Sequence, residues 1–74
     1  MSFRKYIIRN GRDDAWLTNI YEHNDERICT FKPDPAEALV YETLHEARKV
    51  AALARGRVQV LKRGADGKLY GEDA

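Results

Sequence analysis

The sequence lacks the features that mark several large classes of protein. Its 74 residues include one cysteine and two prolines, and no apolar run approaches the roughly 20 residues needed to cross a membrane. Cys29 cannot form an internal disulfide, whereas small secreted domains usually carry several, so a reducing compartment is expected. The first residues have neither the apolar stretch nor the cleavage site of a signal peptide. These absences predict a cytoplasmic protein without membrane contact.

Motifs that carry chemistry are also scarce. The chain contains no phosphate-binding loop and no dinucleotide-binding glycine pattern. The polar run around His23 lacks helical histidine spacing and a thiolate partner, so we expect no metal there. Cys29 lies in an apolar segment and is better explained as a small buried hydrophobe than as a nucleophile, and His45 as a solvated helix residue. The sequence therefore predicts no enzyme, no cofactor and no metal.

One stretch has a structure that its residues specify strongly, from Thr43 to Gly56. Thr43 and Glu46 have the spacing of a reciprocal capping box at a helix start. Apolar residues then recur at steps of three and four, which places them on one helix face. Gly56 is expected to take the left-handed conformation that ends a helix. The stretch predicts one amphipathic helix, which the rest of the chain must cover.

Segments with strand patterns precede and follow this helix in the sequence. Arg4 to Asn10 and Ala15 to Tyr21 predict a hairpin, because Asn10-Gly11 is a strong reversal signal. Glu22 to Arg27 is predicted as a loop, and Ile28 to Phe31 fits either a short strand or an extended connection.

The segments that adjoin the helix are also specified. Asp34 and Pro35 predict a short capped turn, followed by extended residues 39–41. Arg57 to Arg63 predicts a strand, and Lys68 to Tyr70 a short edge strand that pairs back on it.

The fold class that follows is α+β, a small antiparallel sheet with one helix packed on one face. Residues 1–74 form a single domain, with a frayed tail at 71–74. The predicted core takes its residues from every element: Tyr6 or Ile7, Ile8, Leu17, Ile20, Phe31, Leu39, Tyr41, Leu44, Val50, Ala51, Val58 and Val60.

Charge is segregated along the chain, although the formal net charge is only +1. Residues 1–12 are basic without any acid, residues 13–46 are predominantly acidic, and residues 47–68 are predominantly basic. If the first strand and the strand after the helix are neighbours, the molecule has a basic and an acidic side, which suits docking to a large partner. The alternative is that these charges only solvate the surface, and the sequence leaves both readings open.

Nucleic-acid binding is a weaker interpretation. Basic and aromatic residues alternate near Arg4 and again near Lys62, as in single-strand binders. The sequence pI of about 7.9 is below that of dedicated nucleic-acid domains, and none of their motifs is present. We expect contact with RNA only within a larger complex.

A resemblance points to one kind of partner. The runs K-Y-I-I-R-N from Lys5, W-L-T from Trp16 and F-K-P-D-P-A-E-A-L-V-Y-E-T-L-H-E-A from Phe31 resemble small bacteriophage-encoded proteins that take over host machinery. The size, the charge segregation and the K-Y-I-I opening look most like the small transcription regulators of lytic Xanthomonas phages. That resemblance implies a monomer that binds the largest subunit of host RNA polymerase near the RNA exit channel, with an elongation factor nearby. It also implies inhibition of initiation and promotion of antitermination.

The resemblance further implies that the basic residues face acidic protein or emerging RNA, and the aromatic residues are candidate anchors, because aromatic and Arg side chains dominate interface energies. The residues expected to bind the partner are Arg4, Lys5, Tyr6, Arg9, Trp16, Tyr21, Arg57, Lys62, Arg63 and Tyr70. For Tyr6 and Trp16, packing within the sheet is the stronger interpretation.

Two other functions fit the sequence. The acidic middle segment suits a phage inhibitor of another nucleic-acid machine, such as an anti-CRISPR protein, although its acids are dispersed among apolar residues. An open sheet edge suits a small self-associating module.

Overall fold

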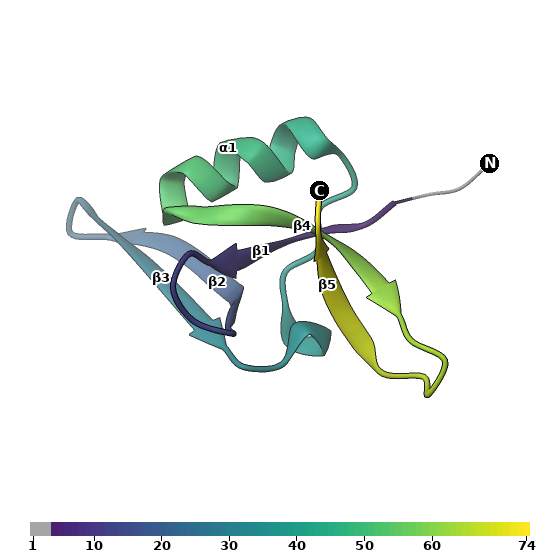
Figure 1. Ribbon diagram of the computed structural model, residues 1–74. Coiled ribbons are helices and arrows are strands. Elements are labelled where there is room, and N and C mark those ends of the chain that lie inside the picture. The colour runs from purple at the N-terminus through teal and green to yellow at the C-terminus, as the bar shows by residue number, and fades with distance from the viewer. Residues whose placement is uncertain (1–3) are drawn as a thin grey trace.

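The computed structural model describes residues 4–74 and confirms the α+β fold (Figure 1). A curled, antiparallel five-stranded sheet has the order β3-β2-β1-β4-β5, and a single helix lies over β1 and β4. The elements are β1 Tyr6–Asn10, β2 Trp16–His23, β3 Glu26–Lys32, the 3-10 turn η1 Pro35–Glu37, α1 Leu44–Ala54, β4 Gly56–Arg63 and β5 Leu69–Asp73.

The pairing of β1 with β4 is the centre of the molecule. Ile7 lies opposite Gln59, and Ile8 lies opposite Val58. Both isoleucines are fully buried, although neighbouring residues of a strand point to opposite faces. Ile8 packs under the helix with Leu17, Ala47 and Ala51, whereas Ile7 is buried on the other face. The sheet is therefore covered on both sides at its centre.

The core prediction was largely confirmed. Ile8, Leu17, Ala51 and Val60 are buried, and most other predicted residues pack half-buried against this cluster. Leu44 is outside the cluster, because it lies at the border of the helix face and is only half-buried. The buried Ala38, Ala47 and Gln59 were missed, since small or polar side chains carry little hydrophobic signal.

Helix α1 begins as predicted and ends one residue earlier than predicted. The Thr43 hydroxyl accepts a hydrogen bond from the Glu46 amide at 3.2 Å. At the other end Arg55, with φ 56°, takes the left-handed conformation that we expected of Gly56. Gly56 instead begins β4, where an added β-carbon would lie 2.5 Å from the Arg9 carbonyl oxygen. The glycine is needed for the close approach of two strands rather than for a helix cap.

The predicted loop at 22–27 is wrong, because these residues continue a long hairpin. Strand β2 runs to His23 and β3 starts at Glu26, joined by a two-residue turn. Asn24 and Asp25 have φ 51° and 64°, the positive values that a type I′ turn requires. Asn and Asp tolerate this conformation better than most residues, so the polar run makes a turn at its middle and strands at its ends.

Strands β1 and β2 separate soon after they meet, and a later segment fills the opening. Their register pairs only Arg9 with Trp16. Beyond that point the Leu39 amide donates to the Leu17 carbonyl at 2.9 Å, while Tyr41 and Tyr6 exchange two backbone hydrogen bonds of 2.8 Å. Residues 39–41 are extended, as predicted, and they supply hydrogen-bond partners for backbone groups of both strands.

The C-terminal residues pair in the sheet instead of fraying. Strand β5 continues to Asp73, which lies opposite Gln59. The buried Gln59 side chain accepts a hydrogen bond from the Trp16 indole at 2.9 Å and donates one to the Asp73 carboxylate at 2.9 Å. This relay ties β2, β4 and β5 together on the face opposite the helix.

Candidate docking surface

The predicted basic side depends on whether β1 and β4 are neighbours, and they are. Their antiparallel register divides the basic residues between two ends of the sheet, because Arg9 lies opposite Arg57 while Tyr6 lies opposite Val60. The ends are separated by about 16 Å, the length of five residues of a strand. We call them the arginine end (Arg9, Arg12, Arg48, Arg55 and Arg57) and the lysine end (Arg4, Lys5, Lys62, Arg63 and Lys68).

Contacts within the protein occupy part of the lysine end. The Lys62 ammonium lies 2.7 Å from the Glu72 carboxylate, and this hydrogen bond raises the pKa of Lys62. Arg63 donates to the Gly67 carbonyl at 3.2 Å and holds the turn before β5. Arg4 and Lys5 line a pocket together with Glu42. Glu72, which we had placed in a frayed tail, therefore offsets charge in this region.

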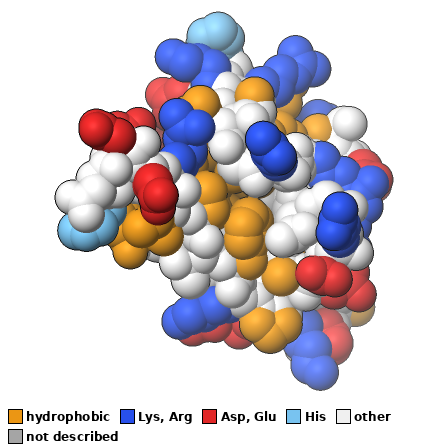
Figure 2. Space-filling view, turned by 90° about the vertical axis from the view of Figure 1, so that its left-hand side faces the viewer, with side chains coloured by type: hydrophobic (Ala, Val, Ile, Leu, Met, Phe, Trp, Pro, Cys, Tyr) orange, Lys and Arg blue, Asp and Glu red, His pale blue; other side chains and the backbone are white. Residues whose placement is uncertain are grey.

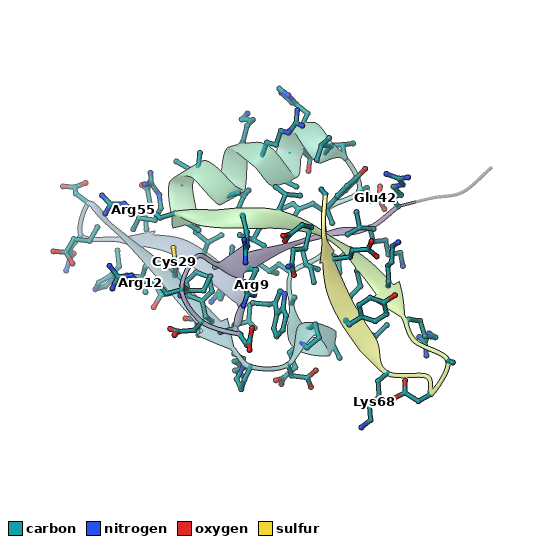
Figure 3. All side chains as sticks on the ribbon, in the orientation of Figure 1. Arg9, Arg12, Cys29, Glu42, Arg55 and Lys68 are labelled. Carbon is teal, nitrogen blue, oxygen red and sulfur yellow. The ribbon has the colours of Figure 1, made fainter. Side chains whose placement is uncertain are left out.

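The arginine end has exposed guanidinium groups on two loops. Arg9 pairs with Asp14, and Arg57 lies 3.7 Å from Asp73. Arg12 and Arg55 are exposed and form no ion pair with any part of the chain that the structure describes. Figure 3 shows them at the same end of the molecule.

The loop after β1 lies against the end of the helix. A β-carbon at Gly11 would lie 3.5 Å from the Arg55 carbonyl oxygen. This contact brings the loop that carries Arg12 to the helix end that carries Arg55.

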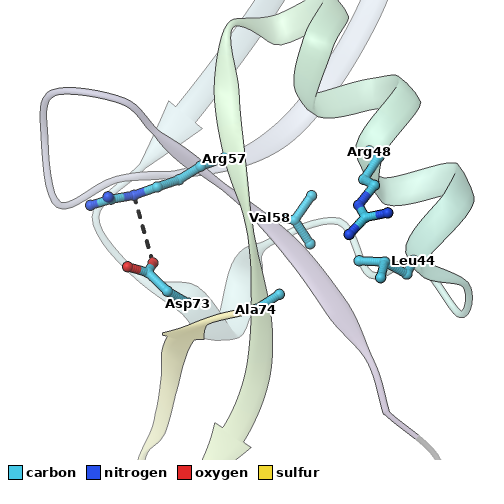
Figure 4. A pocket seen from close by; sticks show the side chains of 6 residues that line it. All are labelled: Leu44, Arg48, Arg57, Val58, Asp73 and Ala74. Atoms are coloured by element: carbon cyan, nitrogen blue, oxygen red, sulfur yellow. Dashed lines mark ion pairs between the residues drawn. The ribbon is translucent and has the colours of Figure 1, made fainter.

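A shallow pocket of about 380 Å³ adjoins this end where β5 stops (Figure 4). Arg57 and Arg48 reach it from opposite sides of β4, with Asp73 below. The two arginines suit a carboxylate of a partner, since guanidinium groups bind carboxylates in a planar, bidentate way.

Half-exposed apolar residues lie near the arginines. The helix covers β1 and β4, and the helix-facing side of the β2–β3 hairpin is therefore only partly buried at Ile20, Cys29 and Phe31. On the helix, the Leu53 side chain remains 47% exposed. Figure 2 shows hydrophobic side chains between the basic ones on this end of the molecule. Apolar surface framed by arginine is typical of the centre of a protein interface.

The predicted aromatic anchors have different surroundings. Tyr6 packs against the core, and the half-buried Trp16 is hydrogen-bonded to Gln59, so both serve the fold. Tyr21 and Tyr70 are 47% and 45% exposed, on different strands. Only the last two are exposed enough to contact a partner.

The sequence interpretation missed Arg12, Arg48 and Arg55 as members of this surface. Arg12 follows the Asn10-Gly11 reversal, and Arg55 immediately precedes the strand that pairs with β1. The register of two strands far apart in sequence brings them together, and no local pattern reports that register. Aligning the first strand antiparallel to the strand after the helix, with attention to where their basic residues meet, would have identified Arg12 and Arg55 as neighbours.

Three acids of the acidic segment are paired with basic residues of the same chain. Asp14 pairs with Arg9, Glu22 lies 3.7 Å from Arg27, and Glu37 lies 3.8 Å from Lys32. Within residues 4–74, no three His, Cys, Asp or Glu side chains are placed to hold a metal ion. Helix α1, the one helix in that range, is too short and too polar to span a bilayer.

Comparison with known proteins gives no match: no family model, no curated protein and no solved structure is similar to this chain.

Proposed function

We propose that this protein is a non-enzymatic regulator that binds a large protein partner through the arginine end, and that the partner is bacterial RNA polymerase. The observation that carries the proposal is the pair of exposed, unpaired arginines, Arg12 and Arg55, beside half-exposed apolar side chains. An acidic surface with apolar residues would complement it, and the charges would steer encounter. The choice of RNA polymerase comes from the resemblance to phage transcription regulators.

The same proposal places the protein in the cytoplasm of the bacterial host, as a phage product acting on transcription. Docking near the RNA exit channel would allow it to inhibit initiation and to promote antitermination. RNA leaving the polymerase would pass close to the lysine end.

Binding is tested with purified bacterial RNA polymerase, as core enzyme and as holoenzyme, at two salt concentrations. The variant Arg12→Glu with Arg55→Asn reverses one of the two exposed charges and removes the other, and asparagine tolerates the positive φ of position 55. We expect it to weaken binding at least tenfold, and we expect the wild-type affinity to fall with salt.

The matched control changes charge by the same amount at the lysine end, as Lys68→Glu with Arg4→Gln. These residues are also exposed and form no ion pair within residues 4–74. Binding of the control should remain within about threefold of wild type. Run-off and terminator read-through assays then report initiation and antitermination separately. Equal loss in both variants would mean that net charge, rather than the arginine end, controls binding.

A further inference from the structure

Strand β3 is a long edge strand. It forms one margin of the sheet, and all seven of its residues, Glu26 to Lys32, pair with β2 on the inner side (Figure 1). The opposite margin, β5, has five residues and packs near η1. An edge strand presents a row of free N–H and C=O groups that another strand can pair with. Of the two margins, β3 offers the longer template.

The hairpin turn determines which backbone groups point outward. Residues that flank a two-residue turn share hydrogen bonds, and the bonded positions then alternate along the strands. His23 and Glu26 flank the turn, so Ile28 and Thr30 direct their backbone groups to β2. The Thr30 carbonyl accepts a bond from the Thr18 hydroxyl of β2 at 3.2 Å, in agreement with this assignment. The remaining positions, Arg27, Cys29 and Phe31, present their backbone groups to the free edge.

The strand is complementary to itself in one antiparallel register. When Cys29 lies opposite the same residue of a second copy, Glu26 lies opposite Lys32 and Arg27 lies opposite Phe31. Opposite charges and a cation beside an aromatic ring are both favourable cross-strand pairs. Shifting the register by two residues leaves strand ends unpaired and removes the Glu26–Lys32 pairs. Pro33, which has no N–H, and the turn at Asn24 end the pairing on either side.

We propose that β3 pairs with β3 of a second copy of this chain in that register, around a two-fold axis at Cys29. The two sheets then join into one continuous sheet, and every outward backbone group of the strand gains a partner. The half-exposed Cys29 and Phe31 side chains also gain cross-strand neighbours. A single strand pair buries less than the roughly 1,200 Å² of a standard interface, so the association is reversible and is measured up to about 1 mM protein. This state replaces the monomer that the resemblance implies.

Sedimentation equilibrium of the full chain tests the association, with a monomer of 8.5 kDa as reference. Glu26→Lys places two lysines opposite each other at both ends of the symmetric pair, and Lys32→Glu places two glutamates there. Each single variant should raise the dimer dissociation constant at least tenfold, since attraction becomes repulsion at two places. The double variant restores opposite charges and should recover the affinity within about threefold.

Lys32 also lies 3.8 Å from Glu37 of its own chain, so the double variant is the decisive control for folding effects. Its recovery requires that the two positions face each other across copies, because within one chain they lie at opposite ends of β3.

The register is tested with the native thiol. Directly bonded antiparallel residues have Cα atoms about 5.5 Å apart, within the range that a disulfide spans. Copper-phenanthroline oxidation should therefore link wild-type chains through Cys29. The matched variant Cys29→Ser with Thr30→Cys places each thiol opposite Ile28, and its cross-linking should be at least tenfold slower.

A mass that stays monomeric up to 1 mM would overturn the proposal. A dimer that ignores both charge reversals would overturn it as well, because the contact would then lie elsewhere, for example at β5. Equal cross-linking rates of the wild type and of the Cys29→Ser, Thr30→Cys variant would reject the register.

Discussion

The β1–β4 centre and the β2–β3 hairpin are built from similar residues but are used differently. At the centre, Ile7 and Ile8 are fully buried on opposite faces. In the hairpin, Ile20 and Ile28 are only half-buried, and one strand has a free edge. Neighbours, rather than composition, make the difference, because the helix packs over β1 and β4 and not over the hairpin. The β1–β4 centre therefore contributes most of the stability, and the β2–β3 hairpin offers most of the surface that a partner can contact.

The largest expected effect comes from truncating one isoleucine to alanine in each of the two regions. Ile8→Ala should lower the free energy of unfolding by about 3–4 kcal/mol, because it leaves a cavity under the helix. Ile28→Ala should cost about 1 kcal/mol, since that side chain already contacts solvent. Urea denaturation measures both. Similar losses in the two variants would show that the hairpin is as tightly packed as the centre.

The next largest loss of stability is expected when the hydrogen bonds of the buried Gln59 side chain are removed. Gln59→Leu removes the acceptor of the Trp16 indole and should cost about 2 kcal/mol, because the part-buried indole N–H and the Asp73 carboxylate both lose their partner. Trp16→Phe removes the donor instead. In a double-mutant cycle the two changes together should cost less than their sum. Strict additivity of the two losses would mean that the hydrogen bond contributes nothing to stability.

A smaller change strengthens the hairpin. Asp25→Gly places glycine at a position with φ 64°, in the Asn-Gly sequence favoured by type I′ turns. It should add about 0.5 kcal/mol to local stability, seen as slower amide hydrogen exchange in β2 and β3. Exchange at the β1–β4 centre should be unchanged. A uniform slowing through the sheet would indicate that the hairpin and the centre unfold as one unit.

The smallest effect concerns alkaline pH. Burial, and secondarily the Glu46 carboxylate, raise the pKa of Tyr41 above its ordinary value of 10.0. Between the two pKa values the folded protein binds more protons than the unfolded chain, so stability should fall as pH rises above about 10. The raised pKa of the exposed Lys62 acts in the same direction. Unfolding curves from pH 8 to 11 for wild type and Tyr41→Phe should differ in slope only above pH 10.

The sequence predicted those parts of the fold that depend on local signals. The Thr43 cap, the Asp34 turn and the strand patterns were found because each signal lies within a few residues of the structure it specifies. The end of α1 was predicted one residue late, because Gly56 serves a contact with Arg9 that lies far away in sequence. The 22–27 run was predicted as a loop, because polarity hides a strand that faces solvent.

The candidate surface was predicted less well, for a related reason. The sequence indicated that β1 and β4 would share their basic residues, but only the register shows that Arg9 and Arg57 lie far from Lys5 and Lys62. The ion pairs of Glu72 and Asp73 depend on β5, whose second half the sequence did not predict.

The position of β1 between β2 and β4 sets the time at which the chain can fold during synthesis. The ribosome makes β1 well before its partner β4, because β4 includes residues 56–63 and the β2–β3 hairpin and the helix lie between the two strands in the sequence. Until those residues leave the exit tunnel, Ile7 and Ile8 lack the strand that buries them. The β1–β4 centre can therefore form only after β4 has left the tunnel, so the earlier part of the nascent chain waits for it without a completed core.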